Sequence, residues 1–186
     1  MSTLVLKDSV TRDDVDDAMA ALGYRLTNVV PAGPGQPAQL IFSQPAGKVV
    51  AYVIDDQRLR VTYLAVQGEA AEPARDALAE RLVALAPEAQ AEILEGLPSA
   101  SGASPELLRA LASLVLQEPD GPRLDRHLEA ALRHPDPQLR VAGLTAVTYR
   151  PRAALRPALD AIAEGDPEPT LRQAAGQILS QLEVTA

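Results

Sequence analysis

Four short segments between residues 24 and 66 carry apolar and β-branched side chains in the pattern of β-strands. In the last of them, alternate residues from Leu59 to Ala65 fall on one face, because side chains two positions apart point the same way along a strand. Turn-forming residues such as Gly47 and Asp55 separate the later segments. The pattern therefore predicts an antiparallel meander. The four segments are 24–30, 39–44, 49–54 and 59–66.

A helix is predicted to precede these strands. Thr11 can cap its first turn, and the four Asp residues that follow favour the positive end of the helix dipole. Val15 and Met19 begin an apolar stripe, and Gly23 ends the helix. The acidic residues lack the spacing of a calcium-binding loop, so they indicate a helix start and no metal site. We therefore expect a small α+β domain over residues 1–68, with the helix on one face of the meander.

After residue 68 the apolar spacing becomes helical and repeats every 32 residues. Each copy begins with proline, at a position where a helix needs no backbone donor. The copies begin at Pro73, Pro105, Pro137 and Pro169. The repeated position predicted to lie in the helix seam is occupied by Leu78, Ala110, Ala142 and Ala174. A second helix follows each of the first three copies, through Ile93, Leu124 and Leu155. We therefore predict an all-α repeat domain over residues 69–186, with three complete hairpins and one final long helix.

The segments DPQLRVAGLTAV, from Asp136, and DPEPTLRQAAGQIL, from Asp166, resemble HEAT-like repeats, including the bacterial type first noted in bilin lyases. The shared pattern is Asp-Pro, a short spacer, an apolar residue followed by Arg, and then Ala at helical spacing. The resemblance covers residues 105–186 well and 69–104 poorly, where Arg75 replaces the expected Leu. It implies a HEAT-like solenoid of helical hairpins with a structural ladder along the stack. The ladder residues would be Asp136, Arg140, Asp166 and Arg172.

Composition narrows the class of protein without indicating a reaction. Aromatic residues make up 3% of the chain and Trp is absent, so the core must be built from aliphatic side chains. The chain has no Cys, and therefore no disulfide, thiolate nucleophile or Cys-based zinc site. No apolar run approaches the ~20 residues that cross a bilayer, and the N-terminal segment does not resemble a secretory signal. These features favour a cytoplasmic protein that does not associate with a membrane.

The charge of the chain is unevenly distributed. The net charge of −8 disfavours extensive binding to nucleic acid, which needs a basic surface. Residues 1–68 contain 6 Lys/Arg, 7 Asp and no Glu, whereas residues 69–186 contain 11 Arg, 18 acidic residues and no Lys. Because this shift coincides with the change from strand to helix spacing, we place a domain boundary near Gly68.

The sequence contains no set of residues that predicts catalysis. His127 and His134 are predicted to lie seven residues apart on one helix, about 10 Å along its axis and therefore too far apart to chelate one metal ion. We expect His134 to end that helix, where an imidazolium suits the negative end of the dipole. No nucleophile motif is present. We therefore predict no enzyme activity, no cofactor and no bound metal.

One segment, which we call the Arg band, carries excess positive charge. Residues 123–156 hold seven Arg against three acidic residues, between acidic neighbours on both sides. The Arg residues either form ion pairs with those neighbours or dock an acidic partner. The candidate docking residues are Arg123, Arg126, Arg133, Arg150, Arg152 and Arg156. Arg150 and Arg152 are predicted to lie in the turn between paired helices, so we expect them to matter most for docking and little for stability.

These observations favour a non-catalytic protein–protein interaction scaffold or adaptor, whose partner is another protein with an acidic surface. Two alternatives remain: a nucleic-acid-binding HEAT-like protein and an accessory to a lyase-type enzyme. The first is weakened by the negative charge and by the shortage of base-stacking aromatic residues. The second depends on analogy of fold alone. The sequence does not indicate an oligomeric state.

Overall fold

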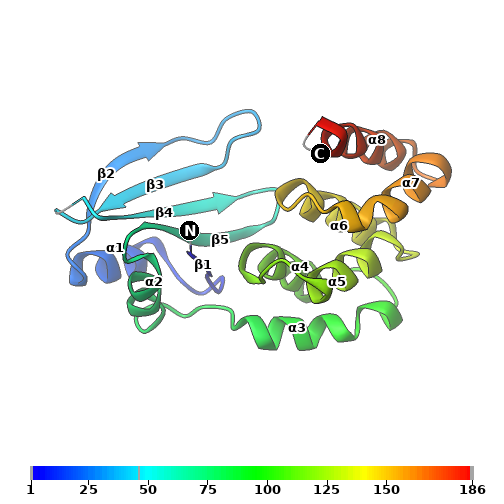
Figure 1. Cartoon of the computed structure of the whole chain (residues 1–186). Coiled ribbons are helices and arrows are strands. Elements are labelled where there is room, and N and C mark those ends of the chain that lie inside the picture. Colours follow the sequence, from blue (N-terminus) through cyan, green and yellow to red (C-terminus); the bar gives the residue numbers. More distant parts are fainter. Residues whose placement is uncertain (1, 46, 185–186) are drawn as a thin grey trace. The chain divides into compact units, whose positions relative to one another are not determined.

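A five-stranded antiparallel sheet forms the first part of the chain in the computed structural model, which describes residues 2–45 and 47–184. The strand order is β1-β5-β4-β3-β2 (Figure 1). The strands are β1 Ser2–Val5, β2 Arg25–Val30, β3 Ala38–Ser43, β4 Val49–Asp56 and β5 Val61–Gly68. The predicted antiparallel meander is confirmed. Strand β1 was missed, because its four residues are too few to show alternation.

Both ends of the β4–β5 pair are fixed by local contacts. At the turn, the Asp56 carboxylate accepts the N–H groups of Arg58 and Leu59 at 2.9 and 3.1 Å. At the other end, Gly68 has a φ of +120°, and a Cβ atom there would lie 1.9 Å from the Lys48 carbonyl oxygen. Only glycine can occupy that position, because any side chain would collide with the neighbouring strand.

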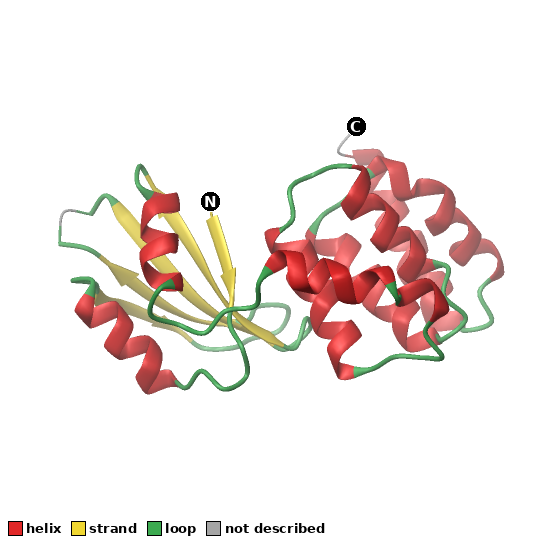
Figure 2. Ribbon diagram, turned by 90° about the horizontal axis from the view of Figure 1, so that it is seen from below, coloured by secondary structure: helices red, strands yellow, loops and turns green. Residues whose placement is uncertain are grey.

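Two helices, α1 (Arg12–Ala21) and α2 (Ala71–Ala79), pack on the same face of the sheet (Figure 2). Met19 of α1, Leu64 of β5 and Leu78 of α2 are fully buried in the core that the helices share with the strands. The face that packs against them is aliphatic except for Phe42 and Tyr24, as the low aromatic content requires.

The start of α1 is confirmed. The Thr11 hydroxyl accepts the Asp14 N–H at 3.2 Å, and the Asp14 carboxylate accepts the Thr11 N–H at 2.8 Å. These reciprocal bonds form a capping box, and the hydrogen bonds from Thr11 lower the pKa of Asp14.

The copy that begins at Pro73 packs on the sheet, so its assignment to the helical repeats was wrong. Its Leu78 and Leu82 lie in the core shared with α1 and the strands. An apolar stripe specifies that a helix must be covered, but it does not specify the surface that covers it. The agreement in spacing with the later copies therefore did not determine where this helix packs.

The domain boundary consequently lies later than predicted. The chain after α2 returns to the sheet, where Ala84 and Leu6 form an antiparallel bridge. The first compact unit is Met1–Ala86 and the second is Pro87–Ala186. The change of pattern near Gly68 marks the end of the sheet, whereas the compact unit includes the helix that follows.

The second unit consists of helices that pack in antiparallel pairs: α3 on α4, α5 on α6, and α7 on α8. Helix α6 contacts both α4 and α8, so the pairs lie in series (Figure 1). The helices are α3 Pro87–Glu95, α4 Pro105–Gln117, α5 Pro122–Leu132, α6 Pro137–Tyr149, α7 Arg156–Gly165 and α8 Pro169–Val184. Two 3-10 turns, η1 Leu97–Ser99 and η2 Ala153–Leu155, precede α4 and α7.

These hairpins are offset by one helix from the prediction, which paired each Pro-initiated helix with the helix after it. In the structure, the helices that begin the copies at Pro105, Pro137 and Pro169 each pair with the helix before them. The pairing follows the Asp-Pro turns, because arginine contacts across these turns hold α6 against α5 and α8 against α7, as described below.

Helices α5 and α6 approach closely at Gly143. A Cβ atom on Gly143 would lie 3.1 Å from the Leu132 nitrogen and 3.2 Å from the Ala131 Cβ. One repeat later the matching residue is Ala175, which is fully buried. The seam therefore passes through these positions. The predicted seam residues Ala142 and Ala174 are only half-buried.

Replacing Gly143 with Ala should stabilise the protein less than replacing Gly176 with Ala. Each change gains about 0.5–1 kcal/mol of helix propensity. Only Gly143→Ala pushes two helices apart, because the space around a Cβ on Gly176 is open. Urea denaturation of the full chain measures both free energies of unfolding. Equal gains would show that the helices do not meet at Gly143.

Candidate functional site

Arg140 lies buried where three segments of the helical unit meet. Its Nε and Nη2 donate to the Asp166 carboxylate at 2.6 and 3.0 Å. Its Nη1 donates to the carbonyl oxygens of His134 and Pro135 at 3.0 and 2.7 Å. The side chains of Arg140 and Asp166 are only 11% and 3% exposed. The hydrogen bond from Arg140 is the main cause that lowers the pKa of Asp166. The pair thus connects the end of α7 to α6 and to the turn after α5.

Arg172 repeats part of this arrangement one unit later. Its Nη1 donates to the carbonyl oxygens of Asp166 and Pro167 at 2.6 and 3.4 Å. These two carbonyls stand six and five residues before Arg172, the same offsets that separate Arg140 from its own carbonyl partners. Each arginine therefore holds the Asp-Pro or His-Pro turn that precedes its helix.

Asp136 binds main-chain groups and no arginine. One carboxylate oxygen accepts the Gln138 N–H at 2.7 Å, which caps α6, and the other accepts the Ala103 N–H at 2.7 Å. The hydrogen bond from Ala103 is the largest cause that lowers the pKa of Asp136, and the bond from Gln138 adds to it. The ladder implied by the HEAT resemblance therefore contains the side-chain pair Arg140–Asp166 and, at its other positions, contacts with the main chain.

His134 connects two turns through its two ring nitrogens. Helix α5 ends at Leu132, so the two histidines do not share a helix. The Nδ1 atom of His134 accepts the Asp136 N–H at 3.0 Å, and its Nε2 lies 3.2 Å from the Ala100 carbonyl oxygen. Because Nδ1 accepts, the proton is assigned to Nε2, which donates to Ala100. The expected helix-end imidazolium is replaced by a link between neighbouring hairpins.

Arg150 and Arg152, which were predicted to lie in a turn, contact carbonyl and carboxylate groups of the helical unit. Arg150 donates to the Val115 carbonyl oxygen at 3.2 Å. This carbonyl ends α4 without its usual partner, because Pro119 has no N–H. Arg152 binds the Asp125 carboxylate at 2.8 and 3.1 Å. Both arginines also contact Asp120. They follow α6 in the chain and bind the end of α4, the α4–α5 loop and α5, so they hold the α3–α4 and α5–α6 pairs together.

The other four arginines of the candidate docking set also have acidic partners. The pairs are Arg123–Glu118 at 3.6 Å, Arg126–Glu95 at 2.8 Å, Arg133–Glu129 at 2.9 Å and Arg156–Glu183 at 3.5 Å. Exposed pairs of this kind stabilise a protein little. Each arginine of the set thus has a carboxylate of its own chain, as the ion-pair hypothesis expects.

His127 of α5 is buried and lacks a hydrogen-bond partner for one ring nitrogen. Its side chain is 3% exposed, and its Nε2 lies 3.6 Å from the Glu95 carboxylate, beyond hydrogen-bond distance. Burial lowers the pKa of His127, and the opposing effect of the Glu95 charge is smaller. The ring is therefore held neutral where an apolar side chain would otherwise be expected.

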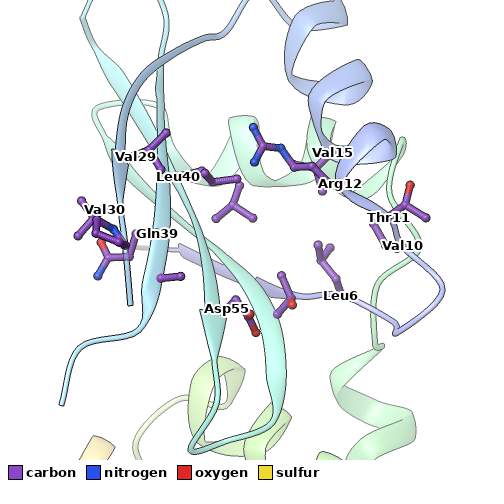
Figure 3. A pocket seen from close by; sticks show the side chains of 14 residues that line it. Leu6, Val10, Thr11, Arg12, Val15, Val29, Val30, Gln39, Leu40 and Asp55 are labelled. Carbon is purple, nitrogen blue, oxygen red and sulfur yellow. The ribbon is translucent and has the colours of Figure 1, made fainter. Parts of the chain in front are cut away.

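A cavity of ≈ 380 Å³ opens between α1 and the β2–β3–β4 part of the sheet. Figure 3 shows Val15 of α1 on one side, Val29 of β2 on the other, and Leu40 of β3 between them. Leu40 is paired with Val53 of β4, and the next residue pair on the same face of the sheet is Ala38 with Asp55. We call this cavity the α1–β2 groove. Its defining residues are Val10, Val15, Val29, Leu40, Val53 and Asp55.

The charge of the α1–β2 groove is concentrated at two positions. Asp55 is exposed, and the Gln57 side-chain amide lies 3.0 Å from both of its carboxylate oxygens. Among the described residues that line the groove, Arg12 is the only basic one, and it is bound to Asp16 at 2.8 Å. Because Asp16 offsets the charge of Arg12, the groove favours an apolar group with a positive charge beside it.

Comparison with protein-family models, with curated proteins and with solved structures gives no match for this chain. Within the described residues, no helix is both long and apolar enough to cross a membrane. Nor do three His, Asp or Glu side chains gather at a possible metal site anywhere in 2–45 or 47–184. The α1–β2 groove is therefore identified as the candidate site from its geometry alone.

Arg140→Met should destabilise the protein by about 3–5 kcal/mol at pH 7, because it leaves the Asp166 charge buried without a partner. Arg133→Met provides the control. It removes an exposed pair on the preceding turn, and we expect a loss of about 0.5 kcal/mol or less. Urea denaturation measures both effects.

The effect of Arg140→Met should also depend on pH. The pKa of Asp166 is lowered in the folded protein. The stability supplied by its charge is therefore present above the ordinary pKa of Asp and is lost as the pH falls below it. The difference between wild type and Arg140→Met should narrow between pH 7 and pH 3. A constant difference would contradict the assignment of the pair.

His127→Leu should remove part of the pH dependence of stability. The pKa of His127 is lowered from its ordinary value of 6.5 in the folded protein. Below that pH the unfolded chain binds a proton that the folded chain does not, so the wild type loses stability as the pH falls from 6.5. The slope contributed by this residue is at most about 1.4 kcal/mol per pH unit. Thermal unfolding at pH 7, 6 and 5 tests this, and parallel curves for wild type and variant would disprove it.

Proposed function

We propose that this chain is a non-catalytic protein–protein interaction scaffold whose α1–β2 groove receives a segment of a partner protein. The observation that carries the proposal is the groove itself. It is a cavity of ≈ 380 Å³, open at the surface of the sheet unit and lined mainly by aliphatic side chains. Concave apolar sites with a few fixed polar groups are typical of ligand and peptide binding. We further propose that the helical hairpins of the second unit form a HEAT-like solenoid.

The chemistry of the groove favours a segment with an apolar side chain and a basic residue next to it. Val15, Leu40 and Val53 offer an apolar surface. Asp55, at one end, is exposed and is contacted by a neutral amide. The negative net charge of the chain adds a general attraction for basic segments. The Arg band supports this proposal less than it was expected to, because its guanidinium groups are already paired.

Two observations support the HEAT-like arrangement of the second unit. The arginine contacts with the turn before each helix recur at Arg140 and Arg172, which are 32 residues apart. The close-packed seam recurs at Gly143 and Ala175 with the same spacing. A regular repeat of this kind gives each hairpin the same neighbours, which is the basis of solenoid stability.

Phage display of short peptides on the purified chain tests the groove. We expect enrichment of peptides that place an apolar residue beside Lys or Arg. Asp55→Lys should reverse the preference toward acidic peptides, because it changes the sign of the charge at the end of the groove. Binding of a synthetic enriched peptide, measured by fluorescence anisotropy, should weaken about tenfold or more with this variant, as for a lost charge pair.

Asp17→Lys is the matched control for Asp55→Lys. Asp17 is an exposed residue of α1 that does not line the groove, and its substitution makes the same change in net charge. We expect this variant to bind nearly as the wild type does. Equal weakening by the two variants would mean that only the overall charge attracts the peptide. A wild type that enriches no peptides would contradict the proposed function.

A further inference from the structure

The sheet of the first unit has one edge closed by its own chain and one edge open. At β1, the Leu85 N–H donates to the Val5 carbonyl oxygen at 2.8 Å, and the Lys7 N–H donates to the Val83 carbonyl oxygen at 3.0 Å. The segment after α2 thus covers the end of that edge, beside Val5 and Lys7. At the opposite end of the strand order, no described strand pairs with the outer side of β2 (Figure 1).

The open strand exposes two large apolar side chains. Leu26 is 44% exposed and Val29 is 56% exposed. A register shift between Leu26 and Asn28 forms a bulge that brings these two side chains onto one face. Leu26 is opposite Phe42 and Val29 is opposite Leu40, which lie two residues apart on β3. Exposed apolar residues on an uncovered edge are typical of a strand that pairs with another chain.

The main chain of β2 is also available at these two positions. The Val29 N–H donates to the side chain of Asn28 at 2.9 Å, which shows that it points away from β3. In an antiparallel ladder, residues two positions apart on one strand have the same main-chain orientation. Leu40 and Phe42 of β3 are two positions apart, so their partners Val29 and Leu26 both direct their main-chain groups away from β3. A carbonyl group of an added strand can take the place of the Asn28 side chain.

We propose that a second copy of this chain pairs with β2, antiparallel, about a two-fold axis between Thr27 and Asn28. In this register Leu26 of each copy lies opposite Val29 of the other, which gives two apolar cross-strand pairs. Arg25, the only charged residue of β2, lies opposite Val30, so no like charges meet. The strand is therefore complementary to itself, as a two-fold interface requires.

This pairing also extends the α1–β2 groove. Val29 lines the groove, and its cross-strand neighbour in the pair is Leu26 of the second copy. The second copy thus supplies an apolar residue at the wall that is otherwise formed only by β2. The pairing is argued from β2 alone and holds whether or not the groove binds a partner protein, and the two are measured separately, as molecular mass and as peptide affinity.

Sedimentation of the full chain tests the proposal. An interface made by one pair of short strands is small, so we expect a dissociation constant on the order of micromolar. The concentration range is therefore about 1–200 µM. We expect the average mass of the wild type to rise from monomer toward dimer. Leu26→Lys and Val29→Glu should each weaken association at least tenfold. Both side chains are exposed, so both variants should fold, which circular dichroism checks. Val141→Glu is the control, because Val141 of α6 is 48% exposed and belongs to the second compact unit.

An equal mixture of the Leu26→Lys and Val29→Glu chains tests the register. Lys at position 26 of one chain would face Glu at position 29 of the other, while the second pair keeps its native residues. We expect the mixture to dimerise more tightly than either variant does alone. A monomeric wild type across the whole range, a dimer that survives Val29→Glu, or a mixture that stays monomeric would each overturn the proposal.

Discussion

The buried pair of Arg140 and Asp166 is the contact on which the helical unit depends. Charges so far removed from water are stable only when their hydrogen bonds are satisfied, and here the guanidinium group meets a carboxylate and two carbonyl oxygens at once. Because the carbonyls belong to the turn before α6 and the carboxylate to the turn after α7, the pair fixes two successive hairpins relative to each other. At the other end of α6, Arg150 binds the end of α4 and Arg152 binds α5, so these residues also hold neighbouring helices together.

Local features of the sequence predicted local structure, because the residues that determine it are close in the chain. The capping box at Thr11 involves residues three positions apart, and the meander strands follow from alternation within each segment. Partners distant in the chain were less predictable. The helix at Leu78 packs on the sheet, and the hairpins are offset by one helix. An amphipathic stripe states that a surface will be covered and leaves open which surface covers it.

The α1–β2 groove could not be predicted, because it is assembled from single residues of several elements. Each is ordinary in its own element: Val15 lies on a helix stripe, and Leu40 and Val53 alternate along strands. One signal was available. Asp55 continues the buried series Val49, Ala51 and Val53 of β4 with a carboxylate. An acidic residue at the end of a core-facing series indicates that the helix cover stops there, which is where the groove opens.

The different fates of the two sheet edges limit how this protein can assemble. A sheet with two open edges can add strands at both sides and grow without end, as fibrils do. Here the segment around Ala84 covers the end of one edge, beside Val5 and Lys7, whereas no described strand pairs with the outer side of β2. A strand that β2 accepts occupies the open edge, and the partly covered β1 edge opposes further addition on the other side. The short segment that returns beside β1 therefore hinders the growth of long aggregates. With that edge partly covered, β2 can expose apolar residues without promoting addition at both sides of the sheet.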